Sequence, residues 1–170
     1  MDWLYIVLRV LHIGSAILWA GGAALFFFYI EPTITKLGPD AEKFVDEVVN
    51  KRKAPIYFAA TSTVAVLAGL TLYYRQAGGF QLWTTTSGTV FTVGAVAAIF
   101  AWIGGNVLIA PAVMKVGAIG QEMKAAGGPP SAELMGRMHA AQERLRTIGK
   151  WDLVLIGIAI LCMESARAFV

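Results

Sequence analysis

One imidazole and one guanidinium interrupt the long apolar run near the start of the chain. The run extends from Trp3 to Ile30, and its only basic side chains are Arg9 and His12. As an α-helix it would be roughly 42 Å long at about 1.5 Å per residue, which exceeds the hydrocarbon core of a bilayer. An ionisable group at such a depth costs several kcal/mol unless it finds a partner. Arg9 and His12 are therefore the first candidate functional residues.

Three roles are open to His12. It is a neutral imidazole hydrogen-bonded between helices, a haem or metal ligand, or a proton relay. The other histidine, His139, precedes Trp151 by 12 residues, or roughly 18 Å of helix, and is predicted at the surface outside the membrane. His12 is predicted near the opposite end of the helices, so we do not expect the two histidines of one protomer to bind the same haem. A haem would need His12 alone, a second ligand such as Met163, or a dimer that shares it.

Two acids near the end of the chain have predicted ion-pair partners. Arg9 stands two turns into the first apolar run, and Glu164 stands a similar distance from the end of the last one. An ion pair between them would offset the cost of both charges, and the alternative is that Arg9 binds an anion or a haem propionate. Asp152 is predicted to pair with a neighbouring lysine at the membrane surface, with proton handling as the alternative.

Four apolar runs must position these side chains. They extend over residues 3–30, 55–74, 88–110 and 153–163 of a chain that is 57% apolar and 15% charged. That composition is typical of polytopic membrane proteins. We therefore expect an all-α fold in a single domain, residues 1–170, with four transmembrane helices.

The segments between the runs predict two hairpins that extend beyond the membrane. The first helix is predicted to end at Glu31-Pro32 and to be followed by an amphipathic helix over 40–53. The third helix is predicted to continue, kinked at Pro111, to the turn at 127–130, after which Ser131 caps the last helix. An apolar seam in that helix has the spacing of a packed bundle and comprises Leu134, Met138, Ala141, Leu145 and Ile148.

The basic residues predict the orientation. Eleven lie on the hairpin side, against Arg9, Arg75 and Arg167 on the other. The positive-inside rule then places the hairpins in the cytoplasm and both termini outside, in a multi-pass protein of the cell (inner) membrane. Trp3, Trp83 and Trp151 are placed as interfacial anchors. The bilayer accounts for the basic charge, so no nucleic acid is expected as a partner, while a homodimer or a larger membrane complex is left open.

A repeated pattern divides the chain into halves 1–76 and 88–170. Trp19-Ala-Gly-Gly22 is followed by Ile30-Glu-Pro32, and Trp102-Ile-Gly-Gly105 is followed by Ile109-Ala-Pro111. Each half would form one helical hairpin, and the two hairpins would be parallel repeats. The alternative is that tryptophan, glycine pairs and proline are simply common in membrane helices and do not indicate a repeat.

The order Arg9, His12, Trp19, Gly21 and Gly22 carries a resemblance. The first helix resembles the opening helix of the copper-resistance D proteins and their four-helix relatives, the protoporphyrinogen oxidase of the HemJ type and the membrane portion of bacterial urate oxidase. The resemblance implies that b-type haem or copper is bound by His12, with Arg9 and Trp19 in the same site. The haem-binding relatives have further intramembrane ligands, and this chain departs from them in having only His139 besides His12.

Three functions follow from these patterns. The leading hypothesis is a membrane protein that binds haem b or copper near its outer face, for electron transfer or for metal or haem handling. The second is a non-catalytic scaffold or assembly subunit with no cofactor, and the third is a small transporter or proton conductor. No paired buried carboxylates, phosphate loop or serine triad occurs in the sequence, so we assign no catalytic residue and leave enzymatic activity open.

Overall fold

The computed structural model describes residues 2–76 and 84–169, and this part of the chain is almost entirely helical, with no strand. The all-α prediction is therefore confirmed. Trp83, one of the predicted anchors, lies outside the described residues. Short π-helical and 3-10 segments interrupt or connect the long helices.

The first helix continues well beyond its predicted end. It comprises α1 (Trp3–Leu25), a π-helical turn η1 (Phe26–Ile30) and α2 (Glu31–Leu37). Pro32 does not end the helix, because the π-turn directly before it accommodates a residue that lacks an N–H and crowds the preceding turn. The chain leaves the helix at Gly38, whose φ of 55° favours glycine.

The remaining helices begin and end close to their predicted positions. Thr85 and Ser131 cap α5 and α7 by accepting backbone N–H bonds from Gly88 and Leu134. The helix predicted over 40–53 is split, and the third helix runs through Pro111 as expected. The segments are η2 (Gly38–Ala41), α3 (Glu42–Val45), η3 (Asp46–Lys51), α4 (Ala54–Gln76), α5 (Thr86–Gly104), η5 (Gly105–Ile109), α6 (Ala110–Ala125), α7 (Ala132–Ser165) and η6 (Ala166–Phe169).

Among the described residues, three helices are long and apolar enough to cross a membrane, as in a multi-pass membrane protein. They are Trp3–Leu37, Ala54–Arg75 and Thr86–Ala125. The predicted fourth span lies in α7, where Lys150, Asp152 and Glu164 stand close to a short apolar stretch. These charges keep α7 below the apolarity of the other three helices.

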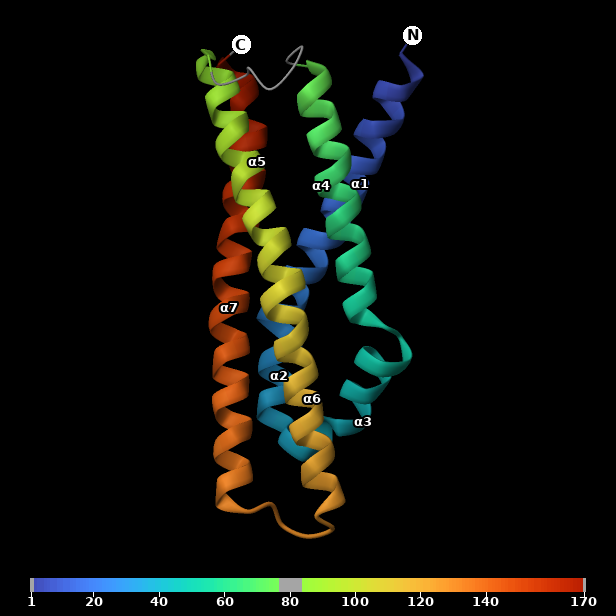
Figure 1. Cartoon of the computed structure of the whole chain (residues 1–170), viewed down its shortest axis with the longest axis vertical. Coiled ribbons are helices and arrows are strands. Elements are labelled where there is room, and N and C mark those ends of the chain that lie inside the picture. Colours follow the sequence, from blue (N-terminus) through green and yellow to red (C-terminus); the bar gives the residue numbers. More distant parts are fainter. Residues whose placement is uncertain (1, 77–83, 170) are drawn as a thin grey trace.

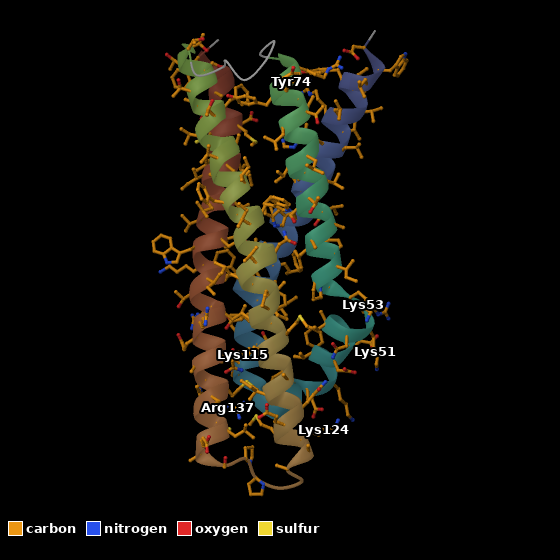
Figure 2. The ribbon with its side chains drawn as sticks, in the orientation of Figure 1. Lys51, Lys53, Tyr74, Lys115, Lys124 and Arg137 are labelled. Atoms are coloured by element: carbon orange, nitrogen blue, oxygen red, sulfur yellow. The ribbon has the colours of Figure 1, made fainter. Side chains whose placement is uncertain are left out.

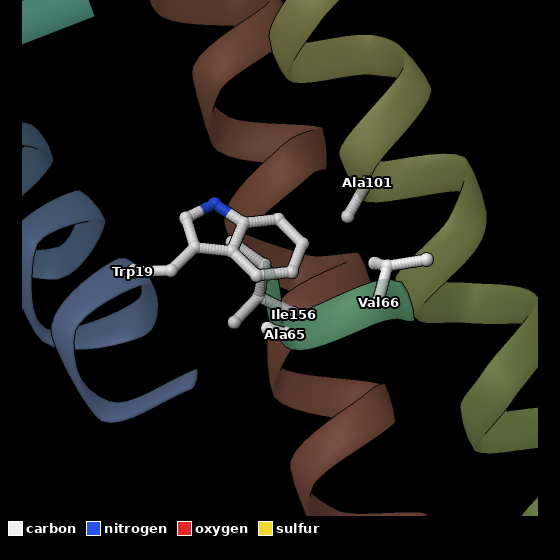
Figure 3. Close-up of a cluster of buried hydrophobic side chains, with 5 residues drawn as sticks. All are labelled: Trp19, Ala65, Val66, Ala101 and Ile156. Carbon is white, nitrogen blue, oxygen red and sulfur yellow. The ribbon is translucent and has the colours of Figure 1, made fainter. Parts of the chain in front are cut away.

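The helices pack in two groups that meet near the middle of the molecule. α1 packs mainly against α4, while α5 and α6 run antiparallel to α7 along its length (Figure 1). The start of α1 and the end of α7 lie at the same end of the molecule. Four helices contribute to the central apolar cluster in Figure 3, which is formed by Trp19, Ala65, Val66, Ala101 and Ile156. Small residues there let the helix backbones approach closely.

Candidate functional site

His12 joins α1 to α4. Its Nδ1 atom lies 2.7 Å from the carbonyl oxygen of Ala65, and a carbonyl only accepts, so Nδ1 carries the proton and donates. The ring lies directly over Gly69, where an added Cβ would be 2.7 Å from His12 Cε1. The arrangement corresponds to the imidazole hydrogen-bonded between helices, and in the neutral form it leaves the Nε2 lone pair available.

The other residues predicted for the haem or copper site do not gather around His12. The Arg9 guanidinium lies 5.7 Å from the centre of the Tyr5 ring, on its own helix. Met163 packs beside Gly94 between α7 and α5, where a Cβ on the glycine would be 3.4 Å from Met163 Cγ. Trp19 is buried in the central cluster. His139 is exposed on α7, as predicted.

Arg9 and Glu164, the predicted ion pair, are joined by no salt bridge within residues 2–76 and 84–169. In Figure 1 the early turns of α1 and the last turns of α7 lie on opposite sides of the molecule. Helices that cross at their middle separate toward their ends, so equal depth in the membrane does not bring the two side chains together.

The described residues contain no group of three or more histidine, cysteine or acidic side chains placed to hold a metal ion. His12 is oriented by its Nδ1 hydrogen bond, as ligating histidines usually are. The predicted second ligand, Met163, belongs to a different helix interface.

Asp152 differs most from its prediction. The sequence predicts an interfacial acid paired with lysine, whereas the structure leaves Asp152 only 7% exposed. Its Oδ1 atom has no hydrogen-bond partner, and none of the salt bridges in the described part of the chain includes it. The position is explained by α5, because Gly104 leaves room for the carboxylate at the helix surface. A buried carboxylate in this state needs a proton or a cation to offset its charge.

Asp152 faces a cavity of about 140 Å³ between the helices. Aromatic rings form much of its wall: Trp19, Phe26, Phe27, Phe58 and Trp102. Two further charged groups line it, Glu31 and the exposed Arg146. The Glu31 carboxylate accepts a hydrogen bond from Thr35, whereas Asp152 Oδ1 lies against Gly104 of α5 and has no hydrogen-bond partner in the described part of the chain.

Hydrogen bonds hold the Trp102 side of the wall in place. Its indole Nε1 donates to Thr63 Oγ1 of α4 at 2.9 Å, which fixes the ring between two helices. Asn106 donates to the Trp102 carbonyl at 2.8 Å, within its own helix. The wall is therefore preorganised around the carboxylate.

Both copies of the repeated pattern contribute to the same cavity. Trp19 and Trp102, the first residues of the two copies, both line it. Each copy also has a π-helical turn ending two residues before its proline, η1 before Pro32 and η5 before Pro111. Residues of both turns face the cavity. π-turns of this kind are often found at functional sites.

The sequence contains one indication of this site, but the indication does not predict the cavity. Asp152 takes the next position of the apolar seam after Ile148, where an apolar residue was expected. Its depth and the cavity beside it depend on how α7 packs against α5, which no spacing within α7 reveals.

Comparisons with known proteins add no relative. No family model, no curated protein and no solved structure matches the chain. The resemblance of the first helix to haem- and copper-handling membrane proteins stays a prediction.

Proposed function

We propose that this protein is a small membrane carrier that binds an organic cation in its central cavity. The observation that carries the proposal is Asp152, which is buried, lines the cavity and has a carboxylate oxygen without a hydrogen-bond partner in the described part of the chain. An ammonium group would supply the missing charge and hydrogen bond. Of the three functions open from the sequence, transport is the one this geometry favours.

The cavity also limits the body of the ligand. An apolar protein cavity of about 150 Å³ holds a molecule of benzene size, and this one measures about 140 Å³. Its aromatic rings attract a cation through their faces as well as packing against an apolar group. The expected ligand is thus an ammonium attached to about one ring or a short alkyl chain.

The carrier part of the proposal requires α7 to be a fourth span. Large apolar side chains on its outer half are exposed as lipid-facing residues are, including Leu161 at 70%. With α7 in the bilayer, the cavity lies between two helical hairpins, and each hairpin has a π-turn beside the ligand. Irregular turns next to a central site are typical of repeat-built transporters.

Equilibrium dialysis with radiolabelled benzylamine tests the binding site. The protein in detergent should bind benzylamine, and unlabelled benzyl alcohol, which has a similar shape but no charge, should not displace it. Asp152→Asn should weaken binding about thirtyfold or more, because one partner of a buried charge pair is lost. Glu164→Gln, an exposed acid on the same helix, is the matched control and should bind normally.

A second pair of variants tests the cavity without altering the acid. A Cβ at Gly105 meets nothing within 4 Å and Gly105 lines the cavity, so Gly105→Val should fold and occupy the ligand space. Gly21 is equally unobstructed and is not among the lining residues, so Gly21→Val should leave binding intact. Equal binding by all four variants, or displacement by benzyl alcohol, would contradict the proposal.

Haem or copper binding at His12 is the competing proposal, favoured by the hydrogen bond that orients the imidazole. A haem would then have His12 as its single axial ligand or would share a second ligand with another copy of the chain. The purified protein would then show a Soret band or bound copper that is lost in His12→Ala. A colourless, metal-free protein that also does not bind benzylamine would support the scaffold role instead.

A further inference from the structure

A second hollow lies outside the helical core, between α6 and α7. Its volume is about 420 Å³, and three basic side chains line it, Lys115, Arg137 and Arg144. Figure 2 shows Lys115 and Arg137 in the lower half of the molecule, beside the two helices. Apolar residues form the rest of its lining, among them Val107 and Leu108, and no acidic residue lines it.

Two of the three basic side chains are not paired with an acid in the described part of the chain. Arg137 donates to both carboxylate oxygens of Glu122, at 2.8 and 3.2 Å, and is neutralised there. Lys115 and Arg144 take part in no salt bridge within the described ranges. The hollow therefore presents two uncompensated positive charges, which favours an anion as its occupant.

The position of the hollow along α7 indicates which anion. Arg144 precedes Trp151 by seven residues, or roughly 10 Å of helix. It therefore lies close to the predicted membrane boundary, on its cytoplasmic side. Val107 and Leu108 are 61% and 47% exposed on the side toward the membrane. An occupant with an anionic head and an apolar chain fits both features, whereas a free phosphate would leave Val107 and Leu108 uncovered.

We propose that this hollow binds an anionic phospholipid. The lipid phosphate lies between Lys115 and Arg144, and an acyl chain covers Val107 and Leu108. Basic pockets between helices at the cytoplasmic face bind anionic headgroups in this way. The site is separate from the central cavity and does not depend on the carrier proposal.

Native mass spectrometry of the protein with phosphatidylglycerol or phosphatidylcholine tests the site. We expect phosphatidylglycerol to be retained preferentially, and Lys115→Gln with Arg144→Gln to weaken its binding roughly tenfold or more. Lys36→Gln with Lys43→Gln removes the same charge from exposed positions outside the hollow and should have little effect. The charge-preserving pair Lys115→Arg with Arg144→Lys should retain the lipid, which separates loss of charge from loss of folding.

Two further outcomes decide between occupants. Inorganic phosphate at millimolar concentration should not displace the lipid, and displacement would identify a free-phosphate site instead. Equal retention of both lipids, or equal losses in the hollow and control variants, would overturn the proposal, because the basic charge would then act without a specific site.

Discussion

His12 and Gly69 form a contact pair across the α1–α4 interface, and the pair gives a direct stability test. A methyl group on Gly69 would lie 2.7 Å from an imidazole that its hydrogen bond to Ala65 holds in place. Gly69→Ala should therefore destabilise the protein by about 1–3 kcal/mol. In the His12→Ala background the same change should cost little, because the ring is gone.

Detergent unfolding of the two single variants and the double variant measures this coupling. Gly14→Ala is the control, since a Cβ there meets nothing within 4 Å and lies on the same helix as His12. Strictly additive losses would show that the two residues do not touch.

At this scale the sequence identified the unusual residues but not their partners. His12, Arg9 and Asp152 stand out because ionisable groups are rare in apolar runs. Which group each one meets depends on helix crossing. Arg9 lies over Tyr5, and Asp152 Oδ1 has no hydrogen-bond partner among the described residues. Gly69 contacts His12 and Gly104 contacts Asp152. In the sequence, nothing distinguishes these two glycines from other small residues of a membrane helix.

The elements were predictable where local chemistry defines them. Ser131 caps its helix as expected, and the glycine-proline turn after α6 precedes it. Pro32 was wrongly predicted to end the first helix, while Pro111 was correctly predicted to lie within the third. The two prolines have the same sequence context, and the π-turn that precedes each of them explains why neither ends a helix.

An ion pair ties the start of α1 to the end of α4, and its strength should follow pH. Asp2 accepts a hydrogen bond from the Tyr5 N–H and pairs with Arg75 at 2.6 Å, and these contacts lower the pKa of Asp2. A lowered folded pKa means that the stabilisation is complete above the ordinary value and is lost as pH falls through the folded one.

Hydrogen exchange at residues 4–8 measures this effect as protection factors. At pH 6 the protection factors of the native protein should exceed those of Asp2→Asn, and in strong acid the protection factors of the two proteins should become equal. A difference in protection factors that persists in strong acid, or the lack of a difference at pH 6, would rule out that the Asp2 carboxylate stabilises the start of α1.

For the whole molecule, the charge distribution predicts the orientation in the membrane. Eleven of the 14 basic residues lie on the side of the 127–130 turn. An accessibility tag in that turn should report the cytoplasm, and a tag at position 170 should report the outside. The reverse labelling would overturn the orientation and would place the proposed lipid site in the outer leaflet.

Binding of an organic cation at the buried Asp152 side chain can be tested by chemical labelling. An apolar carbodiimide enters membrane proteins and modifies buried carboxyl groups that carry a proton, and peptide mass spectrometry locates the adduct. We expect Asp152 to be labelled and N,N-dimethylbenzylamine, a tertiary amine that forms no amide with an activated carboxyl group, to protect it, whereas benzyl alcohol should not. No adduct at Asp152, or an adduct that the tertiary amine leaves unchanged, would show that Asp152 does not bind an organic cation.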